Sequence, residues 1–297
     1  MHGRVRERGR KDGILLEYRH TMGLIERTRD MMAESKKITI SGWDISCSVH
    51  GERGPGLMLI SGFTADKHVW DLVVNDLATR YRVLVFDKPG IGQSHISDTL
   101  SVEKMADIAH ALAKNVFQGD YHLAGHSMGG AIAMAVAKKF GNEISSLALL
   151  CSFPRLGVPF KMVCELKMQM YDDGLSAKYI DQLALPWAFS GKFLSQEGVL
   201  STIYKMQEEN PCPQPKKGYK AQLGALLEFD AHGWLNQIEV PTLVLAGKDD
   251  LIAPEQDSIY LNKQLKNSKL VVMDQTGHVP QIERPAEFVR IMTDFLG

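Results

Sequence analysis

A serine flanked by glycines is the first group in this sequence that could carry out covalent chemistry. It is Ser127, in the run Gly125-His126-Ser127-Met128-Gly129, between a short apolar segment at 121–124 and a helix-like segment that begins near Met128. A sharp turn from strand to helix strains the backbone of such a serine and lifts its hydroxyl above a sheet, and glycines on both sides avoid collisions with the neighbouring main chain. The pattern predicts that Ser127 is a nucleophile.

A serine hydroxyl needs a base to take its proton, and the base needs an acid to orient it. This type of turn is used with the chain order serine, acid, histidine, and only two of the ten histidines, His232 and His278, follow Ser127. His278 comes just after the last segment that reads as a strand, whereas no such strand precedes His232. We therefore predict that His278 is the general base; a histidine in a surface loop is the alternative reading of this residue.

Two adjacent aspartates compete for the role of the acid. Asp249 and Asp250 both follow the apolar segment 242–246, at the end of the strand expected before the histidine loop. From the residues alone the choice between them stays open. For Asp249 the alternative role is a solvated turn residue or a carboxylate near a helix N-terminus.

Acyl transfer places negative charge on a carbonyl oxygen, which needs fixed hydrogen-bond donors. One expected donor is the backbone N–H of Met128, directly after the nucleophile. The other is the backbone N–H of Phe63, in the turn Ser61-Gly62-Phe63-Thr64 that follows the apolar segment 57–60. A further turn at 87–94 contains two glycines but lacks the spacing of a phosphate-binding loop, so we predict that its role is structural.

The segments that must position these groups alternate between strand-like and helix-like patterns from residue 37 onward. A β-hairpin is predicted at 38–40 and 44–49. The continuous apolar runs are typical of parallel strands buried on both faces, so the predicted fold class is α/β, with a doubly wound, mostly parallel sheet. The predicted strands are 57–60, 82–86, 121–124, 147–151, 242–246 and 270–273, and the predicted helices are 69–78, 102–115, 128–140, 254–265 and 286–295.

The alternation stops between residues 153 and 230, which are rich in Met, Leu, Tyr and Lys and predict several helices. We expect this segment to form a helical cap, inserted between the two parts of a core at 36–152 and 231–297. Such a cap would lie over the carboxyl ends of the strands, where open α/β sheets bind ligands. Three large apolar residues could wall a substrate pocket or merely pack the cap: Phe153, Trp187 and Phe189.

Composition argues against several other classes of protein. The 297 residues are 44% hydrophobic and 23% charged, with a net charge of −1, so no overall field favours nucleic acid or an anionic membrane. No apolar run has the length of a membrane span. The four cysteines lack paired spacing, and no metal-binding motif is present. These features predict a cytoplasmic protein with reduced thiols, no metal and no cofactor.

The first 35 residues differ from the rest. They begin with a cluster of basic residues, but the nearby apolar run at 14–16 is far shorter than the roughly 7–15 residues of a secretory signal. We expect residues 1–35 to be a disordered or non-native leader, with Met31 or Met32 as an alternative start. An accessory amphipathic helix or an organelle-targeting segment is the other interpretation.

Taken together, the motifs resemble the α/β-hydrolase superfamily over residues 37–297. The resemblance rests on the turn at 61–63, the turn at 87–94, the elbow at 125–130, the segment 247–254 and Gly277-His278. The superfamily has its acid three residues after the glycine of the fourth motif, which implies a Ser127–Asp250–His278 triad. Serine stands at position 61, where the family usually has histidine, and this change leaves the hydrogen bonding of the loop open.

Within the superfamily, residues 222–230 and 238–242 are similar to 3-oxoadipate enol-lactonases and to the enzymes that demethylate pimeloyl-carrier-protein methyl ester in biotin synthesis. A serine at the elbow argues against haloalkane dehalogenases and epoxide hydrolases, which have aspartate there. The resemblance implies a serine hydrolase that cleaves a small or medium carboxylic ester or lactone, free or carrier-bound, through an acyl-enzyme. A lyase, a cofactor-free peroxidase and a non-catalytic binding protein are the alternatives, and the oligomeric state stays open.

Overall fold

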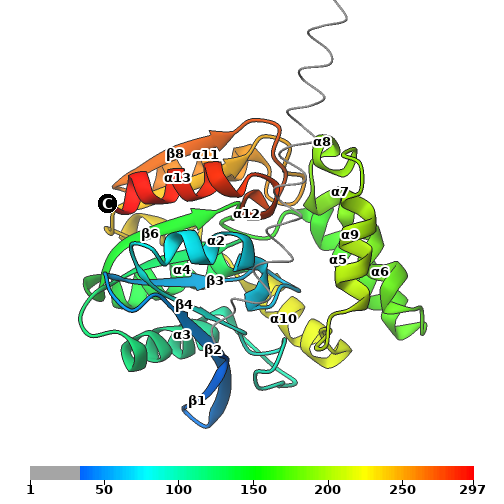
Figure 1. Cartoon of the computed structure of the whole chain (residues 1–297), viewed down its shortest axis with the longest axis horizontal. Coiled ribbons are helices and arrows are strands. Elements are labelled where there is room, and N and C mark those ends of the chain that lie inside the picture. Colours follow the sequence, from blue (N-terminus) through cyan, green and yellow to red (C-terminus); the bar gives the residue numbers. More distant parts are fainter. Residues whose placement is uncertain (1–33) are drawn as a thin grey trace, which may run out of the picture. The chain divides into compact units, whose positions relative to one another are not determined.

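A single sheet of eight strands organises the part of the chain that the computed structural model describes, residues 34–297 (Figure 1). The strand order is β1-β2-β4-β3-β5-β6-β7-β8. The predicted leader, 1–35, lies outside the described residues except for its last two. The strands are β1 (Lys36–Ile40), β2 (Trp43–His50), β3 (Gly56–Ile60), β4 (Arg82–Phe86), β5 (Tyr121–His126), β6 (Ile144–Leu150), β7 (Thr242–Gly247) and β8 (Ser268–Met273).

The sheet is parallel except at one edge. β1 pairs with β2 and β2 with β4 in antiparallel fashion. The six strands β4, β3, β5, β6, β7 and β8 run parallel to one another. In the β1–β2 turn, Ser41 and Gly42 both have positive φ, which suits a two-residue hairpin loop. This arrangement, with helices on both faces, confirms the predicted doubly wound α/β fold class.

Helices cover both faces because the side chains of a strand alternate between them. On β3, Leu57 and Leu59 belong to a hydrophobic cluster with Trp70 and Phe288, from the helices on one face. Met58 belongs to the larger cluster on the other face. The helices that flank the sheet are η1 (Lys67–Trp70), α2 (Asp71–Leu77), α3 (Val102–Val116), α4 (Met128–Phe140), η2 (Gly141–Glu143), η3 (Leu235–Gln237), α11 (Glu255–Gln264), α12 (Pro280–Glu283) and α13 (Pro285–Leu296).

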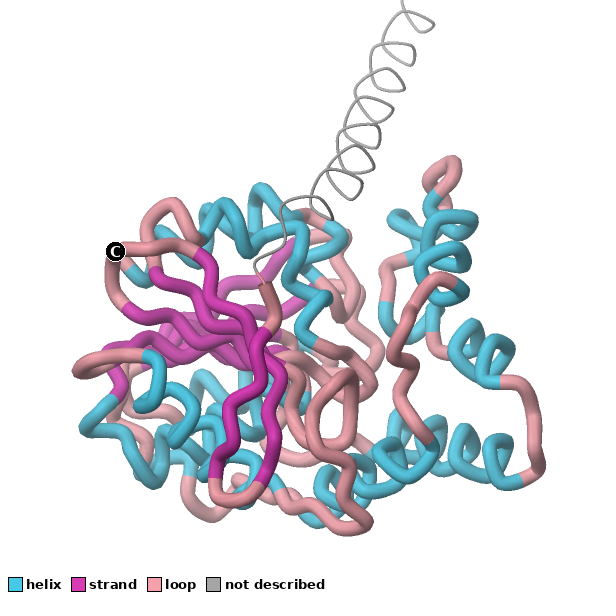
Figure 2. Tube along the Cα trace, turned by 60° about the horizontal axis from the view of Figure 1, so that its bottom comes forward, coloured by secondary structure: helices cyan, strands magenta, loops and turns pink. Residues whose placement is uncertain are grey.

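Six helices are inserted between β6 and β7, within the residues 153–230 predicted to form a cap. They gather on one side of the sheet, seen at the right of Figure 1 and Figure 2. The inserted helices are α5 (Val158–Asp172), α6 (Ala177–Leu183), α7 (Leu185–Ala188), α8 (Gly191–Leu194), α9 (Val199–Glu208) and α10 (Lys216–Glu228).

Helix α10 is packed tightly onto the turn that follows β4. A Cβ atom on Gly218 would lie 2.0 Å from the carbonyl oxygen of Gly90. The amide of Gln222 donates to the carbonyl of Pro89 at 2.7 Å, and that of Gln214 donates to the carbonyl of Gly90 at 3.1 Å. The inserted helices are thus fixed to the carboxyl end of the sheet.

Helix α4 approaches β3 so closely that a side chain has no room at Gly129. A Cβ atom there would lie 2.1 Å from the carbonyl oxygen of Ile60, which is main chain and cannot rotate away. We expect Gly129→Ala to lower the free energy of unfolding by about 1–3 kcal/mol or more, the usual cost of overpacking. Thermal and denaturant unfolding would measure the change.

Gly224→Ala in α10 is the matched control, because a Cβ atom at Gly224 meets nothing within 4 Å. Alanine in a helix interior is more favourable than glycine by roughly 0.5–1 kcal/mol, so this variant should be slightly more stable than the native chain. Equal effects of the two substitutions would contradict the packing argument.

Candidate active site

The predicted nucleophile lies at the turn between β5 and α4. Ser127 has φ 54° and ψ −118°, a conformation that costs a non-glycine residue about 1–3 kcal/mol. Surrounding bonds hold it there: its N–H donates to the carbonyl of Leu150 at 2.9 Å, and its carbonyl accepts from the Ser152 hydroxyl at 2.9 Å. A Cβ atom on Gly125 would lie 2.1 Å from the carbonyl oxygen of Gly129, so the strand and helix can meet in this turn only with glycine.

The predicted base and acid are brought together by the loops after β7 and β8. His278 Nδ1 donates to Asp250 Oδ2 at 2.8 Å, and both residues are only 4% exposed. The other carboxylate oxygen accepts the backbone N–H groups of Ile252 at 2.8 Å and Ala253 at 2.9 Å. Donation from Nδ1 leaves the lone pair on Nε2, the nitrogen that must accept a proton from a nucleophile.

Burial and pairing distinguish the two candidate aspartates from each other, and likewise the two candidate histidines. The neighbouring Asp249 is exposed, whereas Asp250 is the residue paired with His278. His232 is exposed as well, and its Nδ1 lies 2.6 Å from Asp230.

His126 connects the nucleophile turn to the histidine loop. Burial lowers the pKa of His126 to about 3, so its imidazole is neutral. Its Nε2–H donates to the carbonyl of His278 at 2.7 Å. Within residues 34–297 no hydrogen bond joins the Ser127 hydroxyl to His278, and a bond of this kind is often long before substrate binds. His126 therefore holds the main chain of the base beside the serine.

The two predicted oxyanion donors both lie next to the nucleophile. Met128 is the first residue of α4, where amides have no partner within the helix. The Phe63 turn adjoins the serine: a Cβ atom on Gly62 would lie 3.2 Å from Ser127 Cβ. The Phe63 N–H makes no hydrogen bond to any described residue. Both amides are available to an oxygen at this position.

The inserted helices are bonded directly to the histidine loop. The N–H of His278 donates to the carbonyl of Ala188 at 2.9 Å. Glu283 accepts from the hydroxyl of Ser190 at 2.6 Å, from the N–H of Ser190 at 3.2 Å and from the N–H of Gly277 at 2.9 Å. Burial raises the pKa of Glu283, whereas these three bonds oppose that shift. No local pattern indicates this contact, because Ser190 and Glu283 are 93 residues apart.

The three predicted pocket residues lie in different surroundings. Phe153 is 1% exposed and belongs to the main hydrophobic cluster of the sheet. Trp187 and Phe189 are half-buried, at and just after the end of α7 next to Ala188. The ring of Trp187 lies 6.0 Å from that of Phe160, between centroids, and the ring of Phe189 stacks on Phe193 at 5.2 Å. Contact with substrate stays a prediction for all three.

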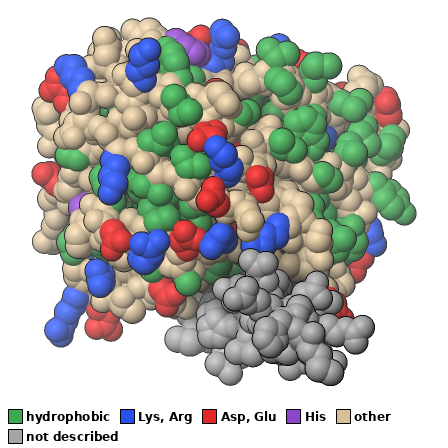
Figure 3. Space-filling view, turned by 90° about the horizontal axis from the view of Figure 1, so that it is seen from above, with side chains coloured by type: hydrophobic (Ala, Val, Ile, Leu, Met, Phe, Trp, Pro, Cys, Tyr) green, Lys and Arg blue, Asp and Glu red, His purple; other side chains and the backbone are tan. Residues whose placement is uncertain are grey.

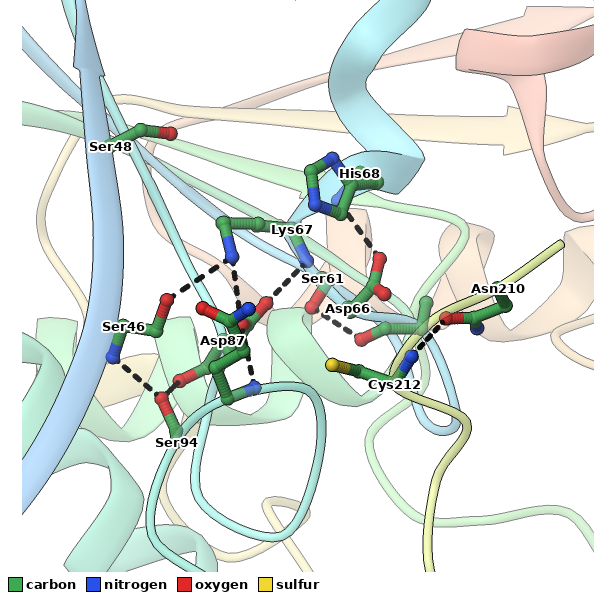
Figure 4. A network of polar contacts seen from close by, with 12 residues as sticks. Ser46, Ser48, Ser61, Asp66, Lys67, His68, Asp87, Ser94, Asn210 and Cys212 are labelled. Carbon is green, nitrogen blue, oxygen red and sulfur yellow. Dashed lines mark hydrogen bonds and ion pairs between the residues drawn. The ribbon is translucent and has the colours of Figure 1, made fainter. Parts of the chain in front are cut away.

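The turn at 87–94, predicted to be structural, contains a buried ion pair. Asp87 accepts from Lys67 Nζ at 2.9 Å and from the Lys67 N–H at 2.9 Å, and Ser46 lies alongside (Figure 4). The next residue, Lys88, is also buried and reaches the Phe63 turn. The only sequence feature that could have marked Lys88 is its place two residues after the apolar run 83–86, which is a weak signal.

The described part of the chain contains neither a cluster of metal-binding side chains nor a helix that could span a membrane. No group of three or more His, Cys, Asp or Glu side chains is arranged to hold a metal ion in residues 34–297. Over the same residues, no helix has the length and apolar character needed to cross a bilayer.

Comparison with known proteins agrees with this geometry. The model of the alpha/beta hydrolase fold family matches residues 55–285, and the chain belongs to that family. A pimeloyl-[acyl-carrier protein] methyl ester esterase from Nitrosomonas europaea is 28% identical over 251 residues, which cover 82% of this chain and 97% of that protein. The family predicted from the motifs is thereby confirmed.

Solved structures give the same fold. A thermophilic esterase from Thermogutta terrifontis superposes with a TM-score of 0.76 at 25% identity, covering 89% of this chain and 98% of that chain. The enol-lactonase from Burkholderia xenovorans LB400 superposes with a TM-score of 0.76 at 24% identity, covering 88% of this chain and 99% of that chain.

The pairing of Asp250 with His278 generates a direct test. Asp250→Asn would keep the shape of the side chain but favour the wrong tautomer of the imidazole, so we expect kcat for ester hydrolysis to fall roughly 10⁴-fold at neutral pH. Asp249→Asn is the control and should lower kcat far less, because Asp249 is exposed. Steady-state kinetics would rank them, and the reverse order would assign the role to Asp249.

Proposed function

We propose that this chain is a serine hydrolase that cleaves carboxylic esters through an acyl-enzyme. The observation that carries the proposal is the buried pair of Asp250 and His278. The carbonyl of His278 is also bonded to the side chain of His126, the residue before Ser127. A carboxylate buried beside an imidazole is costly to desolvate, and both side chains lie in loops that follow parallel strands, at the edge of the sheet where open α/β sheets bind ligands.

Each residue has a distinct role in the proposed reaction. His278 Nε2 takes the proton of Ser127 as the hydroxyl oxygen attacks the ester carbonyl, while Asp250 stabilises the imidazolium. The amides of Phe63 and Met128 donate to the resulting oxyanion. His278 then gives the proton to the departing alcohol. Water, activated by the same imidazole, attacks the acyl-enzyme and releases the acid.

The surface of the inserted helices supports a substrate with an apolar acyl part. Exposed large apolar side chains occur mainly there, on the side of the molecule where Figure 3 shows hydrophobic side chains gathered. Such a concentration is typical of a surface that meets a ligand or partner. We therefore propose a small or medium acyl ester; the name of the Nitrosomonas relative adds a carrier-bound methyl ester as one form to test. The apolar side chains are Val158, Met162, Leu166, Leu175, Tyr179, Leu183, Leu200, Met206 and Leu227.

Replacing the nucleophile tests the proposed function. Ser127→Ala should abolish ester hydrolysis, with a loss on the order of 10⁶ in kcat, as expected when a triad nucleophile is removed. Hydrolysis of p-nitrophenyl esters and labelling by a fluorophosphonate probe would both measure the effect, and circular dichroism would show that the fold is kept. Retention of more than about a tenth of the activity would remove Ser127 from the mechanism.

Replacing the aromatic residues near α7 tests the origin of selectivity. If Trp187 and Phe189 wall the acyl chain, then Trp187→Ala or Phe189→Ala should change the dependence of kcat/KM on chain length several-fold, because each buried methylene contributes about 0.8 kcal/mol. Turnover of an acetyl ester should be largely kept. A panel of esters from acetyl to octanoyl would measure this, and an equal loss for every chain length would mean that the two rings only pack the helices.

A further inference from the structure

Lys88 is a fully buried lysine whose ammonium group faces main chain instead of a carboxylate. It follows β4 and is 0% exposed. Its Nζ donates to the carbonyl of Gly62 at 2.5 Å, to the carbonyl of Ala65 at 2.8 Å and to the hydroxyl of Ser61 at 3.2 Å. The neighbouring carboxylate, Asp87, is bonded to Lys67 instead. All three acceptors of Lys88 therefore lie in the turn that contains Phe63.

One of these bonds acts on the peptide unit that includes the predicted oxyanion donor. The carbonyl of Gly62 and the N–H of Phe63 belong to the same planar trans peptide, so the two groups point in opposite directions. Because the hydrogen bond from Lys88 holds the Gly62 carbonyl in one direction, the Phe63 N–H must point in the opposite direction. A cation on the carbonyl also polarises the peptide, which makes its N–H a stronger donor.

The turn at 62–65 needs stabilisation by a residue outside it, because its own sequence does not favour its backbone conformation. The N–H of Ala65 donates to the carbonyl of Gly62 at 3.2 Å, which closes a β-turn, and Thr64 at the third position has φ 62°. A β-branched residue rarely adopts a positive φ. Lys88 binds both the first and the last residue of this turn and so keeps it closed.

We propose that Lys88 is a positioning residue of the oxyanion hole, which holds and polarises the Gly62–Phe63 peptide so that the Phe63 N–H faces the reacting carbonyl. The inference rests on the proposed ester hydrolysis at Ser127. Lys88 does not touch the substrate and acts only through the peptide.

The three hydrogen bonds of Lys88 indicate the protonation state in which it holds the turn. Three acceptors need three donated protons, which only the ammonium form of a lysine has. Burial lowers the pKa of Lys88 to about 7, and the carboxylates of Asp87 and Asp66 oppose that shift. The three hydrogen bonds to the turn favour the ammonium form further.

The test compares Lys88→Met with the native chain. Methionine keeps the length and bulk of the side chain but cannot donate. We expect kcat for p-nitrophenyl acetate to fall about 10- to 100-fold, less than the roughly 10²–10³ measured when an oxyanion donor is removed outright. KM should change less than about threefold. The inhibition constant of a trifluoromethyl ketone, which forms a tetrahedral adduct on serine, should rise in parallel with the loss in kcat/KM, whereas that of the product acid should not.

Lys67→Met is the matched control, since it also removes a buried lysine from the same region but breaks the pair with Asp87. It should lower the melting temperature while kcat per folded molecule stays within about threefold. If Lys88→Met does not fold, the measurements use Lys88→Met/Thr64→Gly, because glycine adopts the positive φ of position 64 without strain.

The outcomes separate this inference from the proposed function. If the native chain hydrolyses esters and Ser127→Ala does not, the proposed function stands. A kcat of Lys88→Met within about threefold of native, a loss entirely in KM, or an equal loss in Lys67→Met would then overturn the role of Lys88 alone. Failure of the native chain to hydrolyse any ester would overturn both.

Discussion

The close approach of main chain to main chain at the carboxyl ends of β3 and β5 is the constraint on which the site depends. Only glycine fits at Gly125 and Gly129, and Ser127 is held in a strained conformation between them. This packing places the serine at the end of the sheet, within reach of loops from β3, β4, β7 and β8. A parallel sheet brings all those loops to one edge, so residues far apart in the sequence meet there.

Buried polar groups around the site are stabilised in local sets. Asp250 is satisfied by His278 and two backbone amides, and Asp87 by Lys67. Lys88 is satisfied by the turn at 61–65 alone. Because each charge has fixed partners, little reorganisation is needed when charge develops on a substrate, and this condition is what makes preorganised donors effective.

Much of this arrangement could be predicted from local pattern, and the remainder depends on contacts between distant segments. The predicted strand at 82–86 has the bounds of β4. The strand predicted from 147 begins earlier in the structure, since β6 starts at Ile144. The prediction missed these residues because polar Ser145 and Ser146 interrupt the apolar run. The glycine-flanked turn from strand to helix indicated Ser127, and chain order together with the preceding strand indicated His278. The residues by themselves could not separate Asp249 from Asp250. The family resemblance implied Asp250, which is the buried residue that pairs with His278. Nothing local indicated that Lys88 faces a turn more than twenty residues away.

The bonds between Glu283, Ser190 and Gly277 have a consequence for how this enzyme family can diversify. They attach the inserted helices to the loop of the base, and the N–H of His278 is bonded to Ala188 within the same insertion. The insertion is therefore not an independent module. A chimaera that carries the helices of a relative would keep a correctly placed imidazole only if the segment from 188 to 190 came with a matching partner at position 283.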